Sequence, residues 1–173
     1  MVEKLKRKAI HTLFPRDTHP ELPLDPDALQ PGVYKWPLHF MPGLQLTVLC
    51  GGCFGTLARY EIEKWLPTPA ASIPYGTLLI NLLGALLLGA LLESLARHGD
   101  DEGKRQLIRL GVGTGFMGAF TTYSTLAVEV SLLAKHGHQL SGLLYAALSV
   151  VGGLVCCAAG IHLAESYHRE TVR

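Results

Sequence analysis

An uncharged stretch between Arg109 and Glu129 constrains the fold of this chain more than any other feature. Its length is close to the roughly 20 residues that one helix needs to cross a bilayer. Glycine weakens a helix, and unpaired hydroxyl groups are unfavourable in hydrocarbon. Both recur in the stretch, at Gly111, Gly113, Gly115, Gly118, Thr114, Thr121, Thr122, Ser124 and Thr125. Interrupted backbone is tolerated at membrane depth where it is buried in protein or lines a watery cavity, and there it can hold an ion. The stretch therefore predicts a broken membrane helix and suggests an ion pathway.

The distribution of charge predicts three further membrane spans. Charged residues make up only 17% of the chain, and residues 36–58, 65–92 and 139–164 contain no Asp, Glu, Lys or Arg. We place the four spans near 43–63, 76–97, 107–133 and 141–164. A chain of 173 residues with four spans has room for one compact four-helix domain and none for a soluble catalytic domain. We expect an all-α integral membrane protein.

The first 42 residues predict a polar, Pro-rich extension ahead of a four-helix domain at 43–165 and a short tail at 166–173. Basic residues gather at Lys4, Lys6, Arg7 and Lys8, and prolines spaced through the segment exclude a long helix. No apolar core follows the basic cluster, so we do not expect a secretory signal peptide. A cytoplasmic tail is favoured, with a basic contact to the lipid surface as the alternative.

The cysteines and histidines do not form a recognisable catalytic or metal-binding pattern. Cys50 and Cys53, and the adjacent Cys156 and Cys157, lie in apolar blocks without a second spaced pair or a histidine to complete a zinc site. Packing as small hydrophobic residues is favoured over metal or redox chemistry. The histidines fall in tails, loops or span ends, and no Ser-His-Asp pattern stands out. We do not expect an enzyme.

Three polar residues inside or near the spans each allow two interpretations. Arg59 either reaches the membrane interface with its long side chain or provides a fixed positive charge that attracts an anion. Asn81 either links helices through its amide or donates a hydrogen bond to an anion. Glu129 is either an interfacial carboxylate or a buried functional one.

The fourth span carries small and hydroxyl-bearing residues at every fourth position. These are Tyr145, Ser149, Gly153 and Cys157, which share one helix face. Such a stripe is either a packing seam or a hydrogen-bonding track for a desolvated ion.

Three segments together resemble the CrcB/Fluc family of fluoride channels. They are Gly51-Gly-Cys-Phe-Gly-Thr-Leu-Ala-Arg-Tyr60, Gly76-Thr-Leu-Leu-Ile-Asn-Leu-Leu-Gly84 and Gly115-Phe-Met-Gly-Ala-Phe-Thr-Thr-Tyr-Ser-Thr125. Each motif is weak alone, but their order and spacing are specific. The resemblance covers residues 43–165 and leaves the N-terminal segment outside.

The resemblance implies an antiparallel, dual-topology dimer with two fluoride pores and a structural sodium ion on its two-fold axis. Backbone carbonyls of Gly118 and Thr121 would hold the sodium ion. The fluoride pathway would include Asn81, Tyr123, Leu126, Tyr145 and Ser149, and Arg59 and Glu129 match the charged positions of the family. Where the family usually has two phenylalanines, this chain has Tyr123 and Leu126.

The function that follows is passive fluoride export across the inner (plasma) membrane, which lowers the fluoride concentration in the cell. The expected partners are fluoride, sodium, lipid and a second subunit, which is either a copy of this chain or a paralogue. We do not expect a nucleic acid partner.

One alternative function is that of a divergent, weakly conducting subunit that pairs with a paralogue. Another is a small dual-topology cation exporter, against which Glu63, Glu93 and Glu129 argue because they lie near span ends. A membrane scaffold would leave the helix break unexplained.

Overall fold

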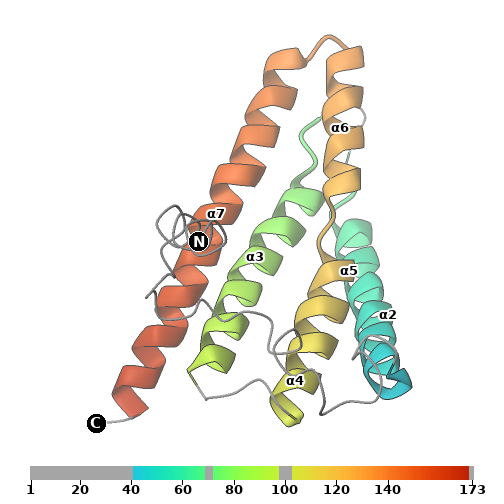
Figure 1. Ribbon diagram of the computed structural model, residues 1–173. Coiled ribbons are helices and arrows are strands. Elements are labelled where there is room, and N and C mark those ends of the chain that lie inside the picture. Colours follow the sequence, from blue (N-terminus) through green and yellow to red (C-terminus); the bar gives the residue numbers. More distant parts are fainter. Residues whose placement is uncertain (1–40, 69–71, 98–102, 172–173) are drawn as a thin grey trace, which may run out of the picture. The chain divides into compact units, whose positions relative to one another are not determined.

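The computed structural model describes residues 41–68, 72–97 and 103–171, and the regular structure within these ranges is entirely helical. The predicted extension over residues 1–42 lies outside them except for Met41 and Pro42. Figure 1 shows the helices running alternately up and down along the chain. Their bounds are α2 Pro42–Trp65, α3 Tyr75–Ala96, α4 Lys104–Ile108, the π-helix η3 Arg109–Met117, α5 Gly118–Phe120, α6 Tyr123–Lys135 and α7 Gln139–Thr171.

Three helical segments of the described residues are long and apolar enough to cross a membrane. They are Tyr75–Ala96, Lys104–Lys135 and Gln139–His168. The outer side of α7 exposes large apolar side chains such as Leu140, Leu143 and Leu154, each at least 66% exposed. A continuous surface of this kind is stable against lipid rather than water. Helix α2 has 24 residues, but it includes Arg59, Glu61, Glu63 and Lys64 and does not meet the same criteria.

Helix α2 packs against η3 and α5, and α3 packs against α7. Two glycines of α2 allow the first contact. A β-carbon at Gly51 would lie 1.9 Å from Gly111 O, and one at Gly55 would lie 2.2 Å from Phe116 O. The absence of side chains at these two positions, four residues apart, therefore allows the helices to approach closely. Behind it, Ile80, Met117 and Phe120 form one buried cluster.

The helical backbone stops for two residues between α5 and α6. Thr121 has φ −78° and ψ 154°, and Thr122 has φ −146° and ψ 118°, which are extended conformations. Upstream, the glycine-rich η3 is a π-helix of nine residues, a form that is rare and usually confined to a single turn. Thr122 begins the next helix as its N-cap, because its side chain accepts a hydrogen bond from Thr125 N. We call Thr121 and Thr122 the interruption.

Candidate functional site

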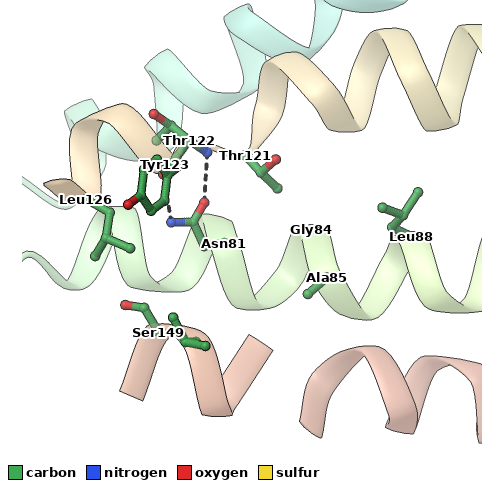
Figure 2. Close-up of a pocket in the computed structure, with 10 residues that line it drawn as sticks. Asn81, Gly84, Ala85, Leu88, Thr121, Thr122, Tyr123, Leu126 and Ser149 are labelled. Atoms are coloured by element: carbon green, nitrogen blue, oxygen red, sulfur yellow. Dashed lines mark hydrogen bonds between the residues drawn. The ribbon is translucent and has the colours of Figure 1, made fainter. Parts of the chain in front are cut away.

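Asn81 of α3 binds the backbone of the interruption through both ends of its side-chain amide. Its Nδ2 donates to Thr122 O at 3.0 Å, and its Oδ1 accepts from Thr122 N at 2.8 Å. Figure 2 shows the side chain reaching from α3 to the interruption, with both bonds drawn. Thr122 is only 6% exposed, so these backbone groups need partners within the protein. Asn81 therefore links two helical segments, and one of its two amide hydrogens remains for another acceptor.

This pairing also changes the bonding of Gly118. In a continuous α-helix the amide of Thr122 would donate to the carbonyl four residues earlier, which is Gly118 O. Here that amide donates to Asn81 instead. The carbonyl of Thr121, which lies outside both helices, accepts none of the non-helical backbone hydrogen bonds of the described residues. The interruption therefore leaves backbone oxygens near the end of α5 without their usual helical partners.

A cleft of about 320 Å³ lies beside the interruption. It gathers residues from α3, α6, α7 and the interruption itself (Figure 2). Four of the residues predicted for an ion pathway line it, namely Asn81, Tyr123, Leu126 and Ser149, together with Thr121. Ser149 is 7% exposed and its hydroxyl donates to Tyr145 O, whereas Tyr123 is 80% exposed. The cleft thus combines polar groups with an aliphatic side chain, Leu126, that is buried in the core beside Leu78.

Glu129 of α6 forms a second polar cluster with the neighbouring helices. Thr77 Oγ1 of α3 donates to Glu129 Oε1 at 2.8 Å, and Tyr145 Oη of α7 donates to Glu129 Oε2 at 2.7 Å. Tyr145 is 1% exposed, and it packs beside Leu126 in the same core cluster. We call Thr77, Glu129 and Tyr145 the carboxylate cluster. Because each residue comes from a different helix, the cluster fixes α3, α6 and α7 relative to one another.

The remaining predicted residues lie away from the cleft. Arg59 of α2 is half-buried, and its Nε lies 3.9 Å from Glu63 Oε1, one turn later in the same helix. Gly118 is exposed and lines a separate groove of about 720 Å³ between α2 and the η3–α5 segment. In α7 the stripe of small residues is buried at Tyr145 and Ser149 but open at Gly153, where a β-carbon would meet no atom within 4 Å.

Sequence reasoning did not single out Thr77 or the backbone of Thr122. A signal for Thr77 was present, because Thr77, Asn81 and Gly84 follow one another at spacings of four and three residues, which place them on one face of α3. No comparable signal exists for Thr122, whose contribution comes from its backbone rather than its side chain.

The fold and the cleft define a multi-pass helical membrane protein with a cleft at a helix interruption. The family model described as CrcB-like protein, Camphor Resistance (CrcB), matches residues 46–161. The chain belongs to this CrcB family.

Several relatives carry a more specific name. The chain is 46% identical over 112 residues to fluoride-specific ion channel FluC 1 of Cutibacterium acnes, which covers 65% of this chain and 78% of that protein. It is 44% identical over 129 residues to fluoride-specific ion channel FluC 2 of Leifsonia xyli, with coverages of 75% and 88%. It is 39% identical over 130 residues to fluoride-specific ion channel FluC of Bordetella petrii, with coverages of 75% and 94%.

Proposed function

We propose that this chain is a subunit of a fluoride channel in the plasma membrane, through which fluoride leaves the cell down its electrochemical gradient. The observation that carries the proposal is the similarity to proteins named fluoride-specific ion channels, which extends over most of their length. The cleft beside the interruption supplies a place for the anion within the same region. A channel performs no covalent chemistry, so the protein is not an enzyme. The relatives' names do not favour a cation exporter.

The cleft has groups that suit a small, strongly hydrated anion. Such an ion enters a pore only if hydrogen-bond donors replace its water. The bonds of Asn81 to Thr122 leave its second amide hydrogen free to donate. The Ser149 hydroxyl would turn from Tyr145 O to the anion, and the positive edge of the Tyr123 ring adds a weaker attraction. Helix α6 also begins at Tyr123, and the N-terminal end of a helix attracts anions. We therefore assign Asn81, Tyr123 and Ser149 to the fluoride pathway.

Leu126 of the cleft and Tyr145 of the carboxylate cluster would connect the two regions of the pathway. Leu126 belongs to both regions, because it lines the cleft and packs with Tyr145 in the core. An aliphatic side chain offers a passing anion no donor, so Leu126 is the position at which we expect conduction to be slowest. The Tyr145 hydroxyl donates to Glu129 and holds that carboxylate in place. Glu129 and Arg59 match the charged positions that the resemblance to the family implies.

We further propose that two subunits assemble as an antiparallel dimer around one sodium ion, with α2 as the fourth membrane-spanning helix. A second subunit would cover the groove beside α2. This groove is lined by Gly118 and by the exposed apolar side chains of Leu49 and Leu57. Sodium prefers oxygen ligands, as hard cations do. Gly118 and Thr121 fit this role because the interruption leaves their carbonyls without the usual helical partners. Two subunits would supply four such oxygens.

Fluoride transport is tested with purified full-length protein in liposomes loaded with potassium fluoride. After valinomycin is added to balance charge, a fluoride electrode in the external solution should record rapid efflux. Liposomes without protein and liposomes loaded with potassium chloride are the controls. Efflux no faster than in empty liposomes, from preparations shown to contain folded protein, would refute the proposed function.

The sodium ion is tested separately from conduction. Purified protein is exchanged into buffer in which a large organic cation replaces sodium, and the dimer fraction and the thermal midpoint are compared with those in sodium. We expect both to fall without sodium and to recover when sodium is returned, but not when the same concentration of potassium chloride is added. Identical values in all three buffers would exclude a structural sodium ion.

A further inference from the structure

Gly84 lies three residues after Asn81 and shares the face of α3 that meets the interruption. It lines the cleft together with Thr121. A β-carbon at Gly84 would lie 2.2 Å from Thr121 Cγ2 and 3.4 Å from Phe120 Cδ1. The first distance is far shorter than any normal contact between carbon atoms. The methyl group of Thr121 therefore occupies the space that any side chain at position 84 would need.

Thr121 cannot easily withdraw that methyl group. Its Oγ1 donates to Met117 O at 2.9 Å, and its backbone amide donates to the same oxygen at 3.0 Å. β-Branched side chains have few accessible rotamers, and the hydroxyl bond selects one of them. Turning Cγ2 away from α3 would break the bond to Met117. A methyl group at position 84 would therefore move the backbone of the interruption away from α3.

Such a movement would separate Asn81 from Thr122. Their two hydrogen bonds measure 3.0 and 2.8 Å, and a displacement of about 1 Å would take both beyond normal hydrogen-bonding distance. We propose that Gly84 is a positioning residue for the fluoride pathway: its missing side chain lets Thr121 lie against α3 and keeps the Thr122 backbone within reach of Asn81. The effect on conduction rests on the proposed function, whereas the steric fit between Gly84 and Thr121 does not.

The test compares Gly84→Ala with the double variant Gly84→Ala/Thr121→Ser. Serine keeps the hydroxyl group and the backbone carbonyl of residue 121 but removes Cγ2, so it relieves only the clash. We expect Gly84→Ala to lower fluoride efflux per folded protein by at least about tenfold, because displacements of this size are costly at a functional site. In the double variant, efflux should return to within about threefold of that of Thr121→Ser alone, since residues in contact are coupled.

Gly89→Ala in the same helix is the matched control. A β-carbon there would lie 2.4 Å from Cys157 O, a backbone atom of α7 that Thr121→Ser cannot move. Thr121→Ser should therefore fail to rescue Gly89→Ala. Gly153→Ala provides the unstrained comparison, because a β-carbon at that position meets nothing within 4 Å. Equal rescue of both strained variants, or no rescue of Gly84→Ala, would overturn the inference.

Thermal unfolding separates this inference from the proposed function. If wild-type liposomes release no fluoride, the channel proposal fails, but a midpoint lowered by Gly84→Ala and restored by Thr121→Ser would still support the steric fit. If Gly84→Ala yields no folded protein, recovery of folded protein in the double variant supports the inference. A double variant that also fails to fold, while Thr121→Ser alone folds, overturns it.

Discussion

The side-chain amide of Asn81 binds both backbone groups of Thr122, through contacts of 3.0 Å to its carbonyl and 2.8 Å to its amide, and it replaces the helical partner of that amide. The two residues are 41 positions apart in the sequence. One side chain of α3 thus completes the backbone where the helical segments on either side stop. Buried backbone groups without partners are costly in a membrane, so this pair stabilises an interruption that would otherwise be unfavourable.

Replacing Asn81 with alanine should both destabilise the protein and slow fluoride efflux. The change leaves the amide of Thr122 without its partner and removes one donor from its carbonyl. A buried unpaired group costs about 1–3 kcal/mol. We expect a lower thermal midpoint and at least about tenfold slower efflux. Ser131→Ala is the control, because Ser131 bonds only the carbonyl of Ala127 in its own helix. Wild-type efflux from folded Asn81→Ala protein would remove Asn81 from the pathway.

Replacing Leu126 with phenylalanine should speed fluoride efflux and lower stability. A phenyl ring presents a positive edge to the anion, which an aliphatic side chain lacks. Leu126 is 7% exposed, so the larger ring overpacks the core at a cost of about 1–3 kcal/mol. The measurements are efflux per folded protein, with chloride as the second anion, and the thermal midpoint. Reduced stability with unchanged efflux would mean that Leu126 only packs.

Tyr145→Phe should lower the free energy of unfolding by about 1.5–3 kcal/mol, because it deletes a hydrogen bond to a charged carboxylate. The loss should be smaller when Glu129→Gln is also present, since the two residues act as one unit. A double-mutant cycle based on denaturant unfolding measures this coupling. Tyr60→Phe, at a side chain 58% exposed on α2, serves as the control. Strictly additive losses would exclude the Glu129–Tyr145 interaction as a stabilising contact.

Two neighbouring glycines of α2 should respond differently to alanine. A β-carbon at Gly51 would lie 1.9 Å from Gly111 O, whereas one at Gly52 would be no closer than 3.8 Å to the nearest atom, Gly115 O. Gly51→Ala should therefore reduce the yield of folded protein severely, and Gly52→Ala should leave it near the wild-type level. Size-exclusion chromatography of detergent extracts measures the yield. Similar yields would show that α2 and η3 do not pack this closely.

The distribution of basic residues predicts a preferred orientation with both termini in the cytoplasm. At the ends of the predicted spans, one side carries Lys35, Arg97, Lys104, Arg105, Arg109, Arg169 and Arg173, and the other carries Lys64 and Lys135. Cytoplasmic loops are enriched in such residues. Accessibility labelling of a terminal tag in intact cells should find most termini protected. A fixed orientation would require an oppositely oriented paralogue in the antiparallel dimer, whereas equal labelled and protected populations would favour a homodimer.

The helical composition and the membrane-capable segments could be predicted from the sequence, because they depend on properties that act locally. In lipid, the backbone groups of an apolar run without charge, such as residues 76–92, must bond to one another, so the run forms a helix wherever it packs. The glycines and hydroxyl groups between Arg109 and Glu129 likewise indicated an irregular segment, because they weaken a helix in any context.

The partners of Asn81 and Glu129 were decided only by the tertiary structure. Asn81 could equally have bound a neighbouring helix or an anion, and Glu129 could have reached the membrane interface. Docking of α3 against α6 and α7 brings Thr77 to a carboxylate 52 positions away and Tyr145 to its other oxygen. The exact end of α5 depends on the same docking, because Asn81 takes the hydrogen bond that would have continued the helix. Interactions between residues so far apart depend on how whole helices pack, and local sequence preferences do not specify that packing.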